Sequence, residues 1–240
     1  MIVSITMVRY RKALIPFALL AMAVHRLPLA LQKGCCFWKL MGSGKGGTFS
    51  LNPDWQQWSL LTVWDDQQEL ERFYERSFIL SWWKKLSTEQ WTIWLSPLQA
   101  HGKWDGKEPF KASEQQHTGP VAVLTRATIR FNRLKNFWAH VDEAAKSMLE
   151  AEGYINSFGV GEAPAYRQAT FSVWESLDDV KNYAYRSRTH ADIIKKTRAE
   201  GWYSEELFAR FKPLKAWGTL NGVDPLHGKL NLINLNEDHS

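Results

Sequence analysis

The 240-residue chain has little cysteine, and its only two cysteines, Cys35 and Cys36, are adjacent. Neighbouring cysteines do not form an ordinary loop-closing disulfide, and two thiolates are too few to build a zinc site by themselves. This excludes a disulfide-stabilised secreted domain and a zinc-finger protein. It is typical of a reducing compartment, so we expect a cytoplasmic location.

The chain also lacks a continuous basic block, although its formal net charge is +5. No nucleic-acid-binding motif is present, so we expect no nucleic-acid partner. Scattered positive charge instead favours an acidic surface, such as anionic lipid or an acidic redox protein, and peripheral membrane contact is one expectation. The glycine-rich residues 42–47 lack the Gly-Lys-Ser/Thr ending of a phosphate loop, which argues against a nucleotide site.

Long hydrophobic runs are absent as well. The longest N-terminal apolar run, residues 13–24, is too short to span a bilayer and contains Pro16. Arg9, Arg11 and Lys12 precede it, so a signal peptide is one interpretation. We prefer a helix of a globular fold, because the run occupies the helix position of the first of two repeats.

Tryptophan, by contrast, is abundant: the chain has 13, and 45% of its residues are hydrophobic. Such a composition supports a substantial core. A cluster of large rings also suits a flat aromatic or polyene ligand, and core packing alone is the alternative.

An internal repeat organises the chain. Residues 62–77, TVWDDQQELERFYERS, align without gaps on residues 172–187, SVWESLDDVKNYAYRS, at an offset of 110. Downstream, Leu95-Ser96-Pro97-Leu98 matches Phe211-Lys212-Pro213-Leu214; upstream, Gly42-Ser43-Gly44 matches Gly159-Val160-Gly161. Self-similarity in this order predicts two copies of one structural unit.

Each copy has the predicted order βαββαβ. We expect strands at 2–10, 37–41, 58–64 and 91–100 with helices at 12–26 and 66–77. In the second copy we expect strands at 121–130, 154–158, 166–174 and 207–216 with helices at 134–151 and 177–185. Such a unit forms a ferredoxin-like antiparallel sheet with its helices on one face. Two units with facing sheets predict an α+β fold: a dimeric α+β barrel within one chain.

The expected organisation therefore has four parts. They are a first ferredoxin-like half (1–102), a polar linker (103–120), a second ferredoxin-like half (121–222) and a polar C-terminal tail (223–240).

The two copies differ after the repeated helix, where the second copy has six extra residues. Thr189 is a good N-cap there, which would make His190 the first residue of a helix. Ile193, Ile194 and Thr197 would share its face. The positive end of a helix disfavours imidazolium, and a neutral imidazole is what a haem iron needs as an axial ligand. A histidine without any ligand is the alternative.

Five blocks carry a resemblance to a known family. They are FWKLMGSG (37–44), HGKWDGKEPF (101–110), LTRATIR (124–130), SFGVGEAPAYRQATFSVW (157–174) and AYRSRTHADIIKKTRAEGWYSEELFARFKP (184–213). They resemble the spheroidene monooxygenase family of carotenoid ketolases. The resemblance implies a monooxygenase that uses haem b and reduced ferredoxin. It would oxidise an allylic methylene of an acyclic carotenoid, or a similar long apolar molecule, to a ketone by two hydroxylations.

The resemblance does not say which histidine binds the iron. His190 is preferred because it lies in the most distinctive block, and His101 and His140 are rivals. Arg167, Gln168 and Arg126 are candidate distal catalytic donors; Arg167 and Gln168 are neighbours on a strand and should point to opposite faces. Arg188 and Arg198 flank the expected helix and are candidate partners of haem propionates.

Three alternatives remain open at this point. The chain could be another haem-binding barrel enzyme, peroxidase- or dehydratase-like, that acts on a small hydrophobic molecule. It could be a haem-binding protein without turnover, or a barrel of the same shape without haem. A homodimer is compatible with each of them.

Overall fold

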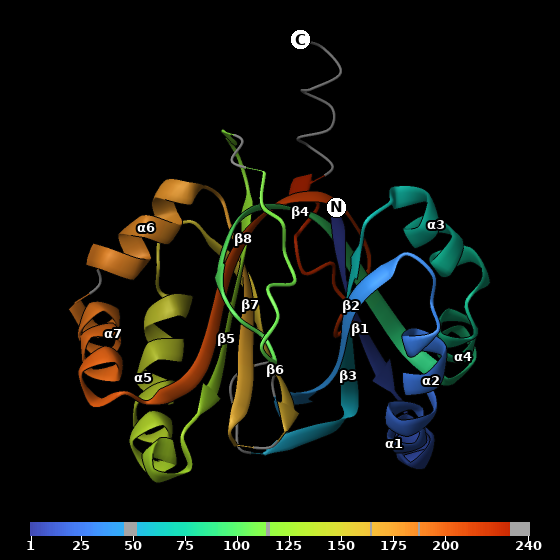
Figure 1. Cartoon of the computed structure of the whole chain (residues 1–240), viewed down its shortest axis with the longest axis horizontal. Coiled ribbons are helices and arrows are strands. Elements are labelled where there is room, and N and C mark those ends of the chain that lie inside the picture. The colour runs from blue at the N-terminus through green and yellow to red at the C-terminus, as the bar shows by residue number, and fades with distance from the viewer. Residues whose placement is uncertain (46–51, 114–115, 164, 187, 231–240) are drawn as a thin grey trace.

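The structure is a computed structural model that describes residues 1–45, 52–113, 116–163, 165–186 and 188–230, except the side chains of residues 185–191 and 194. Within these residues, eight antiparallel strands close into a barrel in the order β1-β3-β2-β6-β7-β5-β8-β4. Helices cover the barrel on two opposite sides (Figure 1). The predicted α+β barrel is thus confirmed.

The first half of the chain contributes one side of the barrel and the helices that cover it. Its elements are β1 (Ile2–Tyr10), a 3-10 turn (Lys12–Leu14), α1 (Ile15–Val24), α2 (Arg26–Ala30), β2 (Cys35–Gly44), β3 (Pro53–Trp64), α3 (Gln67–Arg76), α4 (Phe78–Leu86) and β4 (Ser87–Gly102). Acidic residues stand at the start of α3, as predicted. The Asp66 carboxylate caps the helix by accepting a hydrogen bond from the Gln68 backbone amide at 3.1 Å.

The second half repeats this arrangement. Its elements are β5 (Val121–Ile129), a 3-10 turn (Phe131–Arg133), α5 (Leu134–Leu149), β6 (Tyr154–Ala163), β7 (Arg167–Trp174), α6 (Leu177–Arg186), α7 (Arg188–Glu200) and β8 (Tyr203–Gly218). In the strand order, β4-β1-β3-β2 of the first half corresponds to β8-β5-β7-β6 of the second.

Strand register gives a residue-by-residue match between the halves. Ile2 of β1 faces Trp64 of β3, and Val121 of β5 faces Trp174 of β7, so the aligned tryptophans are equivalent. Val3 faces Leu95, and Ala122 faces Phe211, which confirms the alignment of those two strands. The glycine alignment was wrong by two residues: through β3 and β7 the register matches Gly42 with Gly161, not with Gly159.

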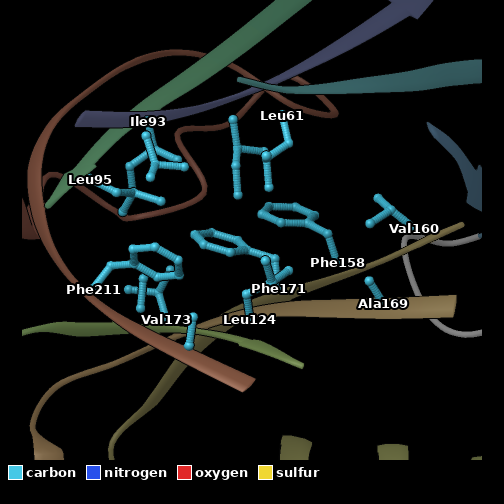
Figure 2. Packing of buried hydrophobic residues seen from close by; sticks show 14 of the residues in the cluster. Leu61, Ile93, Leu95, Leu124, Phe158, Val160, Ala169, Phe171, Val173 and Phe211 are labelled. Atoms are coloured by element: carbon cyan, nitrogen blue, oxygen red, sulfur yellow. The ribbon is translucent and has the colours of Figure 1, made fainter. Parts of the chain in front are cut away.

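The inside of the barrel is packed with apolar side chains from every strand (Figure 2). Phe171 of β7 and Phe211 of β8 are at most 1% exposed. Trp91 of β4 and Phe158 of β6 join the two halves with ring centroids 5.3 Å apart. Because close-packed interiors leave few voids larger than a water molecule, a large ligand must bind outside this core.

Several sequence expectations are corrected. Residues 78–86 form α4, so the first half also has a helix after its repeated helix; α7 is a longer counterpart of α4. Helix α7 begins at Arg188, so Thr189 lies inside it. The N-terminal helical region continues to Ala30, because α2 follows α1.

The segment expected to be a polar linker and the start of the expected polar C-terminal tail also contribute to the core. Trp104 is fully buried and Phe110 is 5% exposed, and both belong to the barrel interior. Leu226 and Leu230 after the second half are buried in the same core, whereas residues 231–240 lie outside the described part of the chain. Segment 103–120 therefore helps to fill the barrel.

Candidate functional site

The outer faces of the two halves of the sheet differ at their centres. On β5, Leu124 and Arg126 are buried on the inside of the barrel, so Thr125 between them points outward, toward the helices. Thr125 is exposed, although β7 and β8 flank it on both sides. Its counterpart Thr6 is 1% exposed and contacts the Tyr74 hydroxyl at 2.7 Å. The second half thus leaves open a position that the first half fills.

Smaller side chains around Thr125 explain this difference. By strand register, the first half places Trp38, Leu40, Trp58 and Leu60 where the second half has Ser157, Gly159, Gln168 and Thr170. Two indoles and two leucines are therefore replaced by side chains that are smaller or absent. We call the surface formed by Thr125, Ser157, Gly159 and Thr170 the open floor.

Helices α5, α6 and α7 stand over this side of the sheet (Figure 1). A hydrogen bond joins helices α5 and α7, because the Glu200 carboxylate accepts from the Asn136 amide at 3.0 Å. The same carboxylate accepts from the Trp202 indole, just after α7, at 2.8 Å. The indole of Trp202, the amide of Asn136, and the charges of Lys196 and Arg133 hold the pKa of the Glu200 carboxyl below its ordinary value. This contact fixes the C-terminal end of α7.

His190 lies in the first turn of α7, and its side chain is outside the described residues. The backbone places it three and seven residues before Ile193 and Thr197, and Thr197 is 8% exposed. The Arg188 side chain is also outside the described residues. Arg198 is exposed and lies ten residues further along α7, about 15 Å from Arg188 at 1.5 Å per residue. Of these two arginines, only Arg188 is near His190.

The rival histidines have different surroundings. His140 on α5 is 2.8 Å from the Asn136 carbonyl through Nδ1 and 3.2 Å from the Lys196 ammonium through Nε2. Both ring nitrogens therefore have partners, and the Lys196 contact joins α5 to α7. His101 on β4 is exposed and stacks on Phe208, with ring centroids 5.1 Å apart.

Phe208 and Arg210 on β8 were not predicted as site residues. Leu207 and Ala209 point into the barrel, so Phe208 and Arg210 point outward, and Phe208 faces Thr125 directly in the register. The Arg210 guanidinium lies over the Phe208 ring at 5.1 Å. Strand alternation in residues 207–211 was the signal that could have placed both beside the open floor.

Arg126 and Arg167, two predicted distal donors, lie together at the inside of the barrel. They share Asp105 as an ion-pair partner, at 3.7 Å and 3.3 Å. Arg126 also pairs with Glu205 and, at 3.6 Å, with Glu162. Lys39 pairs with both Asp105 and Glu162. Three cations thus face three carboxylates, a balance that suits a structural role inside the barrel.

Gln168 is on the other face of β7 from Arg167, as the alternation predicted. Arg167 is part of the interior ion cluster, whereas Gln168 lies two residues before Thr170 on the outer face and donates a hydrogen bond to the Ala163 carbonyl at 3.3 Å. Of the three predicted donors, Gln168 alone shares the face of the open floor.

The interior ion cluster should make the fold sensitive to acid. For Asp105, partial burial is the largest effect and raises the pKa, but Lys39, Arg167 and Arg126 together outweigh it and hold the pKa below the ordinary 3.8. Burial likewise raises the pKa of Glu205, and the Gly106 and Asp105 amides with Arg126 bring it below 4.5. Depressed carboxyl pKa values stabilise the fold above the unfolded pKa, and this stability is lost as pH falls through the folded pKa.

We therefore expect the free energy of unfolding, measured by urea denaturation, to fall as the pH is lowered from 6 to below about 4. Replacing Arg126 with Met should cost about 3 kcal/mol at pH 7, because it leaves carboxylates without their partner, and should flatten this pH dependence. If Arg126→Met unfolds with unchanged free energy, the cluster is not structural and the guanidinium is free for catalysis.

One further histidine, His25 in the first half, was not singled out in the sequence. It is fully buried between α1 and α2, and burial lowers its pKa to about 4. The rings of Phe78, Trp82 and Trp83 approach it edge-on at 6.0, 5.5 and 5.7 Å. Enclosed in this way, its ring packs the α1–α2 junction against α4 and has no open surface for a ligand.

A closed antiparallel barrel with helices outside and an open floor on one half defines an α+β barrel protein with a candidate ligand site between sheet and helices. Solved aldoxime dehydratases share this fold: one, in complex with butyraldoxime, has a TM-score of 0.61 at 14% identity and covers 96% of this chain and 85% of its own. A second has a TM-score of 0.60 at 13% identity. This likeness concerns the fold alone.

Sequence comparison gives the family. The chain is 32% identical to spheroidene monooxygenase of Rhodobacter capsulatus over 219 residues, which are 90% of this chain and 91% of that protein. It is 38% identical to the protein of the same name from Cereibacter sphaeroides over 207 residues, 85% of this chain and 62% of that relative. The chain belongs to the spheroidene monooxygenase family. It spans less than two thirds of the Cereibacter protein, and no family model matches it.

Proposed function

We propose that the chain is a monooxygenase of long apolar substrates, an acyclic carotenoid first of all, with haem b bound between the open floor and α7. The open floor is the observation that carries this proposal. It is the one place on the described outer sheet faces where a central strand residue, Thr125, is exposed beneath covering helices. Membership of the spheroidene monooxygenase family supports the carotenoid and the monooxygenase chemistry.

The residues around the floor suit a flat, mostly apolar group with anionic edges. Gly159 has no side chain, and Ser157 and Thr170 are small, so a planar ring can approach the sheet closely. Phe208 contributes an aromatic edge, and Arg210 a cation beside it. Arg188 or Arg210 would pair with a propionate, and His190 would supply the imidazole that binds the iron.

Haem, when bound, supplies the activation of dioxygen that no amino-acid side chain provides. The chain's own residues orient the group and exclude water. The contacts of Glu200, Asn136 and Trp202 hold the C-terminal end of α7 against α5. Gln168 is the proposed polar donor on the substrate side. Arg126 and Arg167 are placed outside the chemistry, in the barrel interior.

The overall reaction would occur in two rounds. Each round consumes one dioxygen, two electrons and two protons; it places one oxygen atom in a C–H bond of the allylic methylene and releases one water. The second round gives a gem-diol, which loses water to become the ketone. Reduced ferredoxin is the proposed electron donor, and the net positive charge of the chain suits an acidic redox protein.

The matching strand orders of the two halves support a related proposal about the architecture. We propose that each half is a ferredoxin-like unit and that the second unit alone has been opened to hold the cofactor. The bulky outer side chains of the first unit, such as Trp38 and Trp58, close the equivalent space.

The test is a reaction of the haem-loaded chain with reduced ferredoxin, dioxygen and an acyclic carotenoid in detergent micelles. We expect a product in which one methylene has become a carbonyl, preceded by the alcohol, with labelled oxygen in the alcohol when labelled dioxygen is supplied. Product formed only from peroxide, without ferredoxin, would favour a peroxidase-like enzyme. Haem binding without any product from either donor would contradict the proposed monooxygenase activity.

A further inference from the structure

Helix α1 has its small side chains inside and its large ones outside. Ala18 and Ala21 face the barrel and are 1% and 3% exposed. The large apolar side chains on the solvent side are 39–48% exposed: Phe17, Leu19, Leu20 and Val24. A surface helix of a globular protein normally buries its large apolar residues and exposes polar ones. Helix α1 therefore leaves unpartnered the surface that it would be expected to bury.

Helix α2 extends this surface. Leu27 is 67% and Leu31 is 72% exposed, whereas Leu29 between them is buried against the barrel. We call the set Phe17, Leu19, Leu20, Val24, Leu27 and Leu31 the α1–α2 apolar face. Contiguous exposed apolar patches on soluble proteins mark interaction sites.

The second half provides an internal comparison. Helix α5 occupies the corresponding position after its first strand, and it carries charged residues, including Lys135, Asp142, Glu143 and Lys146. Helix α1 has no charged residue between Ile15 and Val24. The fold therefore does not require an apolar helix at this position, and the difference is specific to the first half.

Charge identifies the kind of partner. The first 53 residues contain no Asp or Glu, and the first acidic residue is Asp54. Arg11, Lys12, Arg26 and Lys33 flank the apolar face and are exposed. An apolar face with a basic rim fits the surface of an anionic bilayer. The leucine side chains can insert among the lipid acyl chains, and the lipid phosphates attract the basic side chains.

We propose that the α1–α2 apolar face docks the protein onto anionic lipid bilayers. Residues 12–30 form 19 helical residues that by length and composition could cross a membrane. Ala18, Ala21, His25 and Leu29 nevertheless hold them against the barrel, so they lie along the membrane surface. Helices α5, α6 and α7, which stand over the open floor, lie on the opposite side of the barrel from α1 and α2 (Figure 1), so this inference stands independently of the proposed catalysis.

A second copy of the chain is a less suitable occupant. Symmetric packing of two such faces would bring the two basic rims together, and the α1–α2 segment has no acidic side chain to compensate them. Like charges across an interface suppress association, whereas anionic phosphates complement the same rim.

The test is vesicle flotation of the full chain with phosphatidylcholine vesicles that contain, or lack, phosphatidylglycerol. We expect the chain to float with the anionic vesicles at 0.1 M salt and to be released at high salt, because salt screens the basic rim. The double variant Leu20→Glu/Leu27→Glu should bind at least about tenfold more weakly, since charges replace inserted side chains. Leu149→Glu on α5, where Leu149 is 55% exposed, is the matched control and should float like the parent.

Circular dichroism of each variant shows whether it is folded, so a loss of flotation can be assigned to the surface. Three outcomes would overturn the proposal: no flotation of the folded parent with anionic vesicles, equal flotation with neutral ones, or unchanged flotation of the double variant. Light scattering gives a fourth: a concentration-dependent dimer of the parent that Leu20→Glu/Leu27→Glu abolishes would identify a second copy as the occupant.

Discussion

Replacing Thr170 and Gly159 together by leucine should prevent haem from binding while the barrel stays folded. Leu60 and Leu40 occupy these positions in the first half, so leucine fits the same strand register there. In the second half, the two new side chains would cover the open floor beside Thr125. We expect the affinity for haem, measured by absorption titration, to fall at least about 100-fold, which is about 2.7 kcal/mol.

The same double variant should keep or gain thermal stability as the apoprotein, because it adds apolar contacts where Thr125 is now exposed. Thr88→Leu on β4 is the matched control, since Thr88 is exposed and lies far along β4 from His101, the residue that pairs with Phe208 beside the floor. Unchanged haem affinity in a folded Thr170→Leu/Gly159→Leu variant would place the cofactor elsewhere on the molecule.

Replacing His190 with alanine should abolish ketone formation, with an expected loss of at least about 1000-fold in rate, because under the proposed assignment the haem iron would lose its protein ligand. Added free imidazole should restore the absorption spectrum in part, since it can enter the space left by the side chain. Such rescue separates a lost ligand from a lost fold. Product formation, followed by chromatography under the conditions of the parent, is the measurement.

His140→Ala and His101→Ala are the informative comparisons. His140 should matter for the α5–α7 contact through Lys196, so its loss should lower stability but keep the haem spectrum. His101 is exposed beside Phe208, at the edge of the floor. If His190→Ala keeps both spectrum and activity while His101→Ala loses them, the axial ligand is His101.

The repeat was the most informative part of the sequence. Matching 62–77 with 172–187 predicted which strands and helices correspond, and the paired registers of Trp64 and Trp174 confirm it. Strand β1 was predicted to the residue, because an alternating β-branched segment has few other interpretations. Five of the other strands run longer than predicted at one end or both, whereas β5 and β7 are each one residue shorter. Gly102, at the end of β4, pairs with Leu207 of the other half, a contact that the local sequence does not indicate.

The failures also have physical causes. Residues 78–86 contain two tryptophans and a β-branched residue and gave no polar–apolar period long enough to suggest α4. Segment 103–120 looked polar, yet Trp104 and Phe110 fill the barrel interior, a contact that depends on closure of the barrel. Local composition carries no information about such long-range packing.

For the candidate site, alternation correctly separated Arg167 from Gln168, because opposite faces of a strand follow from the backbone alone. Alternation could not show that Arg126 and Arg167 form ion pairs with Asp105, because Asp105 lies in a loop that is distant in sequence from both. Nor could it show the open floor, which appears only when Ser157, Gly159 and Thr170 are compared with their counterparts in register. The roles of His190, Arg188 and Arg198 remain predictions.

The most direct test of the central claim is an absorption titration of the purified parent chain with haem, alongside the Thr170→Leu/Gly159→Leu variant. The account predicts a Soret band that saturates at one haem per chain in the parent and is absent from the folded variant. A folded parent without a Soret band at any haem concentration would contradict it.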